Sequence, residues 1–364
     1  MIKKTISYIL SLFFVGVIFA QKNNYNDTIR GTWITNVASD VLLNKTNIVK
    51  AVNQCKKNKL NHIFVVVWNN GVTMYPSKVV EKYIGVKQSN RYKNFDPIAC
   101  IISEAHKQQI KVHAWFEFGF SFGYKDTLGK WAQKYPHWIG RKRNGEMLNK
   151  NGFYWWNALH PEPQKFLTEL VSEVVNKYDI DGVQGDDRMP ANPSEGGYDA
   201  FSLQLYFNEH NGKQPPVNAK DTAFVNWKAN KLNLFAKNLY AKVKTLKPNC
   251  LVTWAPSIYP WCKQEYLQDW PIWLQDGYAD YIIPQLYRYK IDAYEKVLVE
   301  LNNTIPSKFK HKVFPGILTS LGDGYQSTSS LTQQMIELNR KYGFAGEVFF
   351  YYETLNRLKD NIYK

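Results

Sequence analysis

Cysteine is scarce in this sequence, and several short motifs with a known chemistry are missing. Only Cys55, Cys100, Cys250 and Cys262 occur among 364 residues, and no two of them are spaced as C-x-x-C. The chain also lacks G-x-G-x-x-G and G-x-x-x-x-G-K, the glycine-rich patterns that hold phosphates after a strand. These absences argue against a cysteine-based zinc site and against a nucleotide-binding doubly wound sheet.

Long hydrophobic runs are also missing, except at the N-terminus. Lys3 and Lys4 precede an apolar stretch that ends at Phe19, and Ala20 is followed by the polar segment QKNNYND. This layout is typical of a secretory signal peptide, and the run is shorter than the roughly 20 residues of a bilayer span. We therefore predict that residues 1–20 are cleaved and that the mature protein is exported to the periplasm, the cell envelope or the extracellular space. A retained N-terminal anchor is the alternative.

Acidic residues are outnumbered, with 31 Asp and Glu against 46 Lys and Arg. Cleavage after residue 20 would remove two lysines and no acid, so the formal charge would fall from +15 to +13. The basic residues are dispersed, which fits a solvated cationic surface or attraction for an acidic partner. Nucleic acid fits poorly with export, whereas an anionic polysaccharide or envelope surface fits better.

Short β-branched or aromatic runs alternate with amphipathic helical segments, which is typical of βα units in a parallel sheet. The eight predicted strands are 30–35, 62–68, 111–118, 181–187, 251–257, 281–287, 312–319 and 347–353, and the clearest helices begin at Asp96 and Phe224. We predict an α/β fold, a (β/α)8 TIM barrel over residues 21–364, with its functional face at the C-terminal strand ends. An open doubly wound sheet is the alternative. Cys55 and Cys100 fall on neighbouring predicted helices, where one disulfide is conceivable.

Two connections on that face are far longer than a barrel needs, and such loops are usually functional. One follows the third strand, from Gly119 to about His160, and the other follows the fourth, from Arg188 to about Asp221. The first carries Trp155 and Trp156, whose indole faces suit stacking on sugar rings.

Three carboxylates follow the third and fourth strands, namely Glu117 and the pair Asp186 and Asp187. Glycosidic hydrolysis needs one carboxylic acid and one carboxylate nucleophile or base, so neighbouring strand ends suit this chemistry. Asp186 is predicted to be the nucleophile or base, because strand alternation points it into the barrel mouth together with Gln184. Asp187 would then face the next loop or raise a neighbour's pKa.

Glu117 is predicted to be the acid, because Phe116 and Phe118 would partly desolvate it and raise its pKa. A salt bridge to a loop Arg or Lys is the structural alternative for Glu117. The Asp pair could bind a hard cation instead, but such a site needs further oxygen ligands. We therefore predict no metal and no cofactor. His113, inside the third strand, is predicted to be a core residue.

Other strand ends and loops supply amides and aromatic rings that suit saccharide binding. The predicted substrate-binding residues are Asn36, Trp68, Asn69, Trp155, Trp156, Gln184, Trp254, Gln285, Tyr287 and Glu353.

Several segments resemble one family in order and spacing: RGTWITNVASDVL, VVVWNNGVTMYPS, VHAWFEFGF, NALHPEPQKF, DIDGVQGDD, LKPNCLVTWAPS, YIIPQLYR and GEVFFYYETL. Over nearly the whole mature chain, the sequence is similar to the glycosyl-hydrolase-like 10 family. The resemblance implies a TIM barrel in an exported or envelope-associated enzyme, with relatives that include a division-associated hydrolase of peptide-free peptidoglycan strands. It places the family's carboxylates at Glu117, Asp186 and Asp187. The chain departs from many relatives at Gly185 and Arg188, where those have a larger apolar residue and His.

The function predicted from the sequence is an exported glycoside hydrolase that cleaves a polysaccharide. Denuded peptidoglycan is the leading substrate, because each repeat carries a lactyl carboxylate that would attract a basic protein. A non-catalytic glycan-binding barrel and a scavenging hydrolase of plant or algal polysaccharide are the alternatives.

Overall fold

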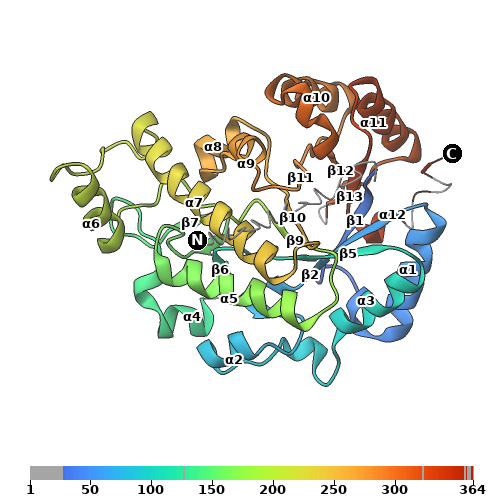
Figure 1. The fold of residues 1–364 in the computed structure, drawn as a ribbon, viewed down its shortest axis with the longest axis horizontal. Helices are drawn as coiled ribbons and strands as arrows, with labels where there is room; N and C mark the ends of the chain where they lie inside the picture. Colours follow the sequence, from blue (N-terminus) through green and yellow to red (C-terminus); the bar gives the residue numbers. More distant parts are fainter. Residues whose placement is uncertain (1–27, 126–127, 322–323, 356–357, 359–361, 364) are drawn as a thin grey trace, which may run out of the picture.

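Eight parallel strands form the centre of the computed structural model, which describes residues 28–125, 128–321, 324–355, 358 and 362–363 (Figure 1). The strands are β1 (Arg30–Ile34), β2 (His62–Val66), β5 (Lys111–Trp115), β9 (Gly182–Gly185), β10 (Leu251–Trp254), β11 (Tyr281–Ile282), β12 (Gly316–Leu318) and β13 (Glu347–Phe350). Their order is β11-β10-β9-β5-β2-β1-β13-β12. Parallel bridges from Ile282 to Val313 and from Gln285 to Gly316 join the two ends of this order. The predicted (β/α)8 barrel and all eight of its strands are confirmed.

These strands form because their residues can be buried on both faces. All five residues of β2 are buried, and so are four of the five in β5. A parallel strand covered by helices on one side and by the barrel interior on the other favours such apolar, β-branched runs. His113 of β5 is fully buried and its ring stacks on Phe64, with centroids 4.5 Å apart, so its predicted place in the core is confirmed.

Helices alternate with the strands and cover the outside of the barrel (Figure 1). They are α1 (Lys45–Lys57), α3 (Pro97–Lys107), α5 (Pro161–Lys177), α7 (Thr222–Leu246), α9 (Trp270–Gln275), α10 (Ile291–Thr304), α11 (Ser329–Lys341) and α12 (Tyr352–Leu355). Asp96 caps α3 by accepting a hydrogen bond from Ala99 N, as its Asp-Pro start predicts. Helix α7 begins at Thr222, before the predicted Phe224, because Asp221 caps it.

Shorter elements build the connections at the C-terminal strand ends. The connection after β2 contains β3 (Trp68–Asn69), β4 (Val72–Thr73), α2 (Lys78–Ile84) and the 3-10 turn Asn90–Tyr92. The long connection after β5 contains β6 (Ser121–Tyr124), α4 (Gly129–Lys134), β7 (Asn149–Lys150) and β8 (Phe153–Trp155). The connection after β9 contains α6 (Ala200–Glu209), and the one after β10 contains α8 (Trp261–Tyr266). Strands β6, β8 and β7 form a small antiparallel sheet, so the first long loop is an ordered subdomain.

All four cysteines are unpaired, so no disulfide joins Cys55 of α1 to Cys100 of α3. Within the part of the chain that the structure describes, no helix is long and apolar enough to cross a membrane. The predicted signal peptide, residues 1–20, lies outside the described residues.

Candidate active site

Glu117 and Asp186 lie level with each other at the ends of neighbouring strands. Strand β5 pairs with β9 in a register that sets Trp115 opposite Gln184, and each carboxylate comes two residues later. The guanidinium Nη2 of Arg188 lies 3.6 Å from Glu117 Oε1 and 3.7 Å from Asp186 Oδ2. These two oxygens are therefore at most about 7.3 Å apart, which is compatible with the carboxylate spacings of glycoside hydrolases.

Asp186 is held by hydrogen bonds on both of its carboxylate oxygens. Trp115 Nε1 donates to Oδ2 at 2.7 Å, and Gln285 Nε2 donates to Oδ1 at 2.9 Å. The backbone N–H of Asp187 also donates to Oδ1. The side chain is 3% exposed, so these donors fix its orientation at the base of the mouth. Because every partner is an N–H donor, the oxygens are set up as acceptors, as a nucleophile or base requires.

Burial governs the protonation of Glu117. Burial raises the pKa of Glu117 from 4.5 to about 7, although the Arg188 charge and the Asn69 hydrogen bond lower it. Asn69 Nδ2 donates to Oε2 at 2.6 Å, whereas Oε1 lies 3.6 Å from Arg188 Nη2. Phe116 and Phe118 on either side are buried, and the predicted rise of the pKa by desolvation is confirmed. A carboxyl group with this pKa can serve as a general acid near neutral pH.

Arg188 contacts all three carboxylates, and the sequence did not predict this. Besides Glu117 and Asp186, it pairs with Asp187 at 3.0 Å through Nη1, and its Nε donates to the Glu117 carbonyl at 2.8 Å. The guanidinium lies 4.7 Å from the ring centroid of Phe153, so β8 covers it. The sequence signal for this role was the position of Arg188 directly after Asp186 and Asp187. The salt bridge considered as a structural alternative for Glu117 is therefore also present.

Burial and neighbouring charges together set the proton affinities of Glu117 and Asp186. Burial and the neighbouring charge of Asp187 raise the pKa of Asp186, while Arg188 lowers it. The Asp187 side chain is 31% exposed and pairs with Arg188. Its predicted effect on a neighbour's pKa is confirmed. Burial and the charge of Asp186 also raise the pKa of the Tyr287 phenol, which therefore stays protonated beside the carboxylates.

The predicted polar binding residues divide into three amides that reach the site carboxylates, directly or through Asn69, and Glu353, which does not. Asn36 Oδ1 accepts from Asn69 Nδ2 at 3.0 Å, so both join the Glu117 side of the site. Gln285 reaches Asp186 from the other side. Glu353 instead accepts from Ser39 Oγ at 2.7 Å, which ties it to the connection after β1.

Two predictions about tryptophans on the long loop need correction. Trp155 and Trp156 are 1% and 0% exposed, so neither has a free ring face for a sugar. Trp156 instead packs against Trp131, with ring centroids 4.9 Å apart. Trp155 packs against Tyr266, with ring centroids 5.9 Å apart. The three-stranded sheet buries them, because apolar rings packed under it lose more water contact than rings left on the loop.

Trp68, Trp254 and Gln184 are also corrected from substrate contact to support. All three side chains are fully or almost fully buried. Trp68 Nε1 donates to Gly119 O at 3.1 Å. The ring of Trp254 packs against that of Trp273, with centroids 5.5 Å apart. Gln184 does point into the barrel as strand alternation predicts, but it accepts from Trp33 Nε1 at 2.7 Å, below the mouth.

Gly185, at the end of β9, occupies a position with no room for a side chain. A Cβ added there would lie 2.3 Å from Met189 O and 2.5 Å from the Trp254 ring. The close approach of these two groups excludes any larger residue in this structure. Gly185 thereby lets the segment after β9 fold tightly beneath Asp186.

The segment Gly119–Gly123 reads GFSFG and matches the G-x-S-x-G pattern of serine hydrolases. Ser121 is fully buried, however, and its Oγ donates to Phe118 O at 2.6 Å. It begins β6 instead of joining a strand to a helix, so it does not form a nucleophile elbow. Among the described residues, no group of three His, Cys, Asp or Glu side chains is arranged to hold a metal ion.

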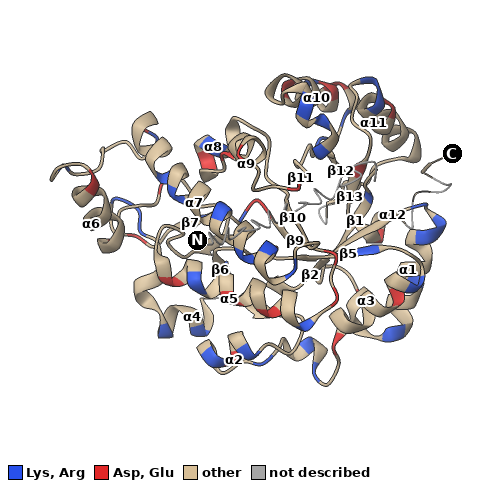
Figure 2. Cartoon of the chain, in the orientation of Figure 1, with Lys and Arg blue, Asp and Glu red and all other residues tan. Residues whose placement is uncertain are grey.

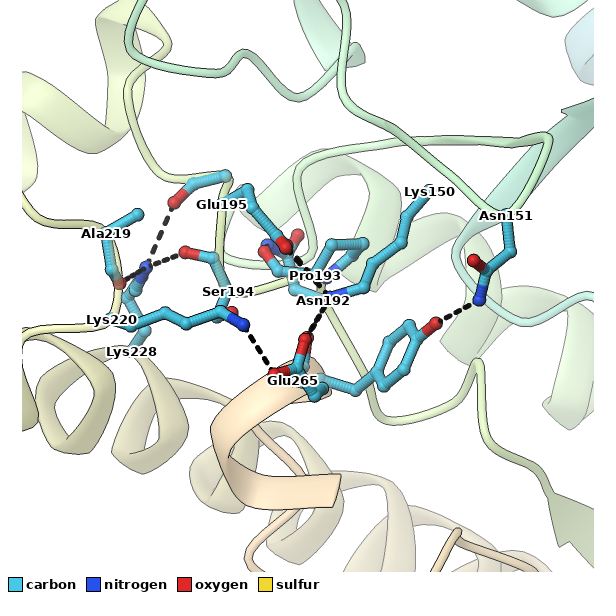
Figure 3. Close-up of polar contacts among 12 residues, drawn as sticks. Lys150, Asn151, Asn192, Pro193, Ser194, Glu195, Ala219, Lys220, Lys228 and Glu265 are labelled. Atoms are coloured by element: carbon cyan, nitrogen blue, oxygen red, sulfur yellow. Dashed lines mark hydrogen bonds and ion pairs between the residues drawn. The ribbon is translucent and has the colours of Figure 1, made fainter. Parts of the chain in front are cut away.

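Ion pairs and a buried lysine join three connections at the C-terminal strand ends (Figure 3). Lys150, in the connection after β5, pairs with Glu195 at 2.9 Å and with Glu265 of α8 at 2.7 Å. Lys228 of α7 is fully buried, and its Nζ donates to the carbonyls of Ser194, Gly196 and Ala219, which all belong to the connection after β9. We call this arrangement the loop clamp.

The closed barrel and its carboxylate-lined mouth define a TIM-barrel protein with a candidate acid-base site. The sequence profile of the family described as Glycosyl hydrolase-like 10 matches residues 28–323. The chain belongs to this family.

Two curated relatives cover much of the chain. The glycosyl hydrolase YngK of Bacillus subtilis is 23% identical over 403 aligned positions, which cover 98% of this chain and 75% of that protein. The glycosyl hydrolase DigH of Escherichia coli K12 is 24% identical over 296 positions, which cover 71% of this chain and 65% of DigH. The chain therefore spans just under two thirds of DigH.

Solved structures with a similar fold are glycoside hydrolases. The glycoside hydrolase domain of PgaB from Bordetella bronchiseptica has a TM-score of 0.67 at 12% identity, covering 92% of this chain and 97% of that domain. The alpha-L-fucosidase isoenzyme 2 from Paenibacillus thiaminolyticus has a TM-score of 0.68 at 16% identity, covering 91% of this chain and 48% of that protein. At these identities the likeness concerns the fold.

Proposed function

We propose that the protein is an exported glycoside hydrolase that cleaves a polysaccharide chain. The observation that carries this is the pairing of Glu117, with a pKa of about 7, and the fixed carboxylate Asp186 across neighbouring strand ends. Membership of a glycosyl-hydrolase-like family supports the same reaction class.

Glu117 would donate its proton from Oε1 to the leaving glycosidic oxygen, while Asp186 would attack the anomeric carbon or activate a water. Arg188 would hold both carboxylates in place and balance their charge. Asp187 would keep Arg188 oriented through its 3.0 Å ion pair. Asn36, Asn69, Gln285 and Tyr287 border the mouth and would meet the sugar hydroxyls.

Denuded peptidoglycan is the substrate that we favour, because its repeated carboxylates complement a mature chain whose formal charge, after loss of Lys3 and Lys4 from +15, would be +13. The DigH and YngK relatives are both named glycosyl hydrolases, which supports the class of reaction. A scavenging hydrolase of plant or algal polysaccharide would use the same site on another chain.

The test measures new reducing ends and product masses on denuded peptidoglycan and on a panel of neutral and acidic polysaccharides. We expect turnover by the wild type and a loss of at least about 1000-fold in E117Q and D186N, since each removes one half of the acid-base pair. The exposed variants E337Q and D292N make the same chemical changes on α11 and α10 and should keep full activity. Equal activity in D186N and the wild type would contradict the proposed reaction.

A non-catalytic glycan-binding barrel is the second candidate, because Arg188 already satisfies all three carboxylates. It would show binding without turnover on every glycan, with D186N binding like the wild type.

Export is a separate part of the proposal, and it rests on the sequence before residue 21. Expression of the full chain in a bacterium should give a secreted or envelope-associated product whose N-terminus, read by mass spectrometry, lies near Gln21. A cytoplasmic product that starts at Met1 would contradict export.

A further inference from the structure

A cavity of about 920 Å³ is lined by the connection after β2 and by part of the long connection after β5. Two segments connect it to the carboxylates. Asn69, which donates to Glu117, is followed directly by Asn70 in the cavity wall. Arg91 donates to Asn36 O, and its neighbour Asn90 lines the cavity. Two segments of the cavity wall are therefore directly continuous in sequence with residues that contact the Glu117 side of the candidate active site.

The charged groups of this cavity are mostly cationic. Lys87, Lys93 and Lys130 line it, and all three are exposed. In the described ranges, none of the three ammonium groups forms an ion pair or a hydrogen bond with another described residue. Three cations around one concave surface attract an anion more strongly than lysines on a convex surface, because their fields add there.

Asp96 is the acidic residue of the wall, and its carboxylate already has partners within the fold. Its Oδ1 accepts from Ala99 N at 3.1 Å, and its Oδ2 accepts from Tyr178 Oη at 2.7 Å. Lys177 lies 3.5 Å from Oδ2. Lys177 balances the charge of Asp96, so the formal charge of the wall residues stays positive.

The remaining wall suits a sugar. The side chains of Asn70 and Asn94 offer donors and acceptors for hydroxyl groups, and Gln88, whose Nε2 already donates to the carbonyls of Met74 and Phe95, offers its Oε1 as an acceptor. Phe122 and Trp131 also line the cavity but are almost fully buried. The volume lies at the upper end of the range for pockets that bind small organic ligands. A single monosaccharide would leave much of it empty, so a disaccharide or longer segment fits better.

We propose that this cavity is a subsite for a carboxylate-bearing sugar of the substrate chain, with Lys87, Lys93 and Lys130 as its anion-binding residues. This inference rests on the proposed function, because it assumes that the glycan occupies the barrel mouth. It assigns recognition of the acidic group to the connection after β2 and the chemistry to the carboxylates.

The test uses binding in an inactive background, so that it does not depend on turnover. E117Q protein is titrated calorimetrically with peptide-free peptidoglycan oligosaccharides and with the same oligosaccharides after chemical reduction of their carboxyl groups. The triple variant K87Q/K93Q/K130Q should bind the carboxylated form about 10-fold more weakly, since each exposed ion contact contributes roughly two- to threefold. Its affinity for the reduced form should change by less than about twofold. The control K50Q/K237Q/K296Q removes the same charge from exposed sites on α1, α7 and α10 and should change neither affinity at physiological salt.

The outcomes separate this inference from the proposed reaction. If the triple variant loses affinity only for the carboxylated ligand, the subsite is supported even when the wild type shows no turnover. In that case the hydrolase proposal alone fails. Equal affinity of the triple variant and the E117Q parent for the carboxylated ligand overturns the subsite. The subsite is also overturned if the triple variant loses the same affinity for both ligands. It is overturned as well if E117Q shows no measurable binding of the carboxylated ligand.

Discussion

At the scale of single residues, the site depends on how one arginine balances three carboxylates. Arg188 lies within 4 Å of an oxygen of Glu117, Asp186 and Asp187. Its charge lowers the pKa of Glu117 and of Asp186, whereas their burial raises both. The protonation states that catalysis needs are therefore set by this balance.

Replacing Arg188 by Met should move the pH profile of activity to higher pH. Loss of the guanidinium removes a charge that lowers the pKa of both Glu117 and Asp186, so the acidic and the basic limbs of kcat/KM shift upward together. The basic limb of the wild type should lie near pH 7, the pKa of Glu117. R143M, which removes an exposed arginine, should leave the profile in place. A basic limb that does not move in R188M would mean that another group limits activity at high pH.

E117Q should be inactive yet more stable than the wild type at alkaline pH. The pKa of Glu117 is raised on folding from 4.5 to about 7, so the folded state holds its proton more tightly than the unfolded state. The contribution of Glu117 to stability is complete below pH 4.5 and is lost as the pH rises through 7, at a cost of up to about 3 kcal/mol.

Thermal unfolding from pH 4 to 8 measures this effect. Glutamine does not titrate, so the Tm of E117Q should increase relative to the Tm of the wild type as the pH rises. E337Q is the control, because Glu337 is exposed. A difference that stays constant across this range would show that burial does not raise the pKa of Glu117.

At the scale of elements, the loop clamp joins the connections that surround the carboxylates. Lys228 of α7 donates to three backbone carbonyls of the connection after β9. Lys150 and Lys220 both pair with Glu265 of α8, so the connections after β5, β9 and β10 share one carboxylate. Arg188 and Asp187 begin the connection that this clamp fixes.

Replacing Lys228 by Met should destabilise the protein by about 2–4 kcal/mol, because buried carbonyls would lose their donor. The measurement is chemical denaturation, accompanied by hydrogen exchange of the segment 192–221. K220M is the matched control, since the Lys220 side chain is 43% exposed and its pair with Glu265 should contribute less than about 1 kcal/mol. Equal stability of K228M and the wild type would show that the carbonyls find other partners.

The sequence predicted the barrel elements better than it predicted the loops. Each strand is a local run of buried residues, and the carboxylates follow directly from strand ends, so Glu117 and Asp186 could be placed without long-range information. The burial of Trp155 and Trp156 depends on the pairing of β8 with β6 and β7, which no local pattern indicates. The role of Arg188 could not be predicted either, because it depends on how Gly185 lets the next segment turn.

At the scale of the whole molecule, positive charge is spread widely around the barrel. Figure 2 shows Lys and Arg on most helices, while the acidic residues are fewer and interspersed. The formal charge, +15 for the full chain and +13 after the proposed cleavage, should therefore act on an acidic polymer at long range, separately from the contacts in the subsite. This distinction can be tested because salt screens distant charges more than contacts within a cavity.

Association of E117Q with a carboxylated glycan should become slower as salt increases, and the remote charges should matter only at low salt. At about 10 mM salt the screening length is roughly 30 Å, so K50Q/K237Q/K296Q should slow association about twofold, because its lost charges still reach the approaching polymer. At 150 mM the length is about 8 Å, and this variant should match its parent. Stopped-flow measurement of both rate constants checks this, with the carboxyl-reduced glycan as the uncharged control. An association rate for the carboxylated glycan that does not depend on salt would show that the basic surface is only solvated and does not guide the substrate.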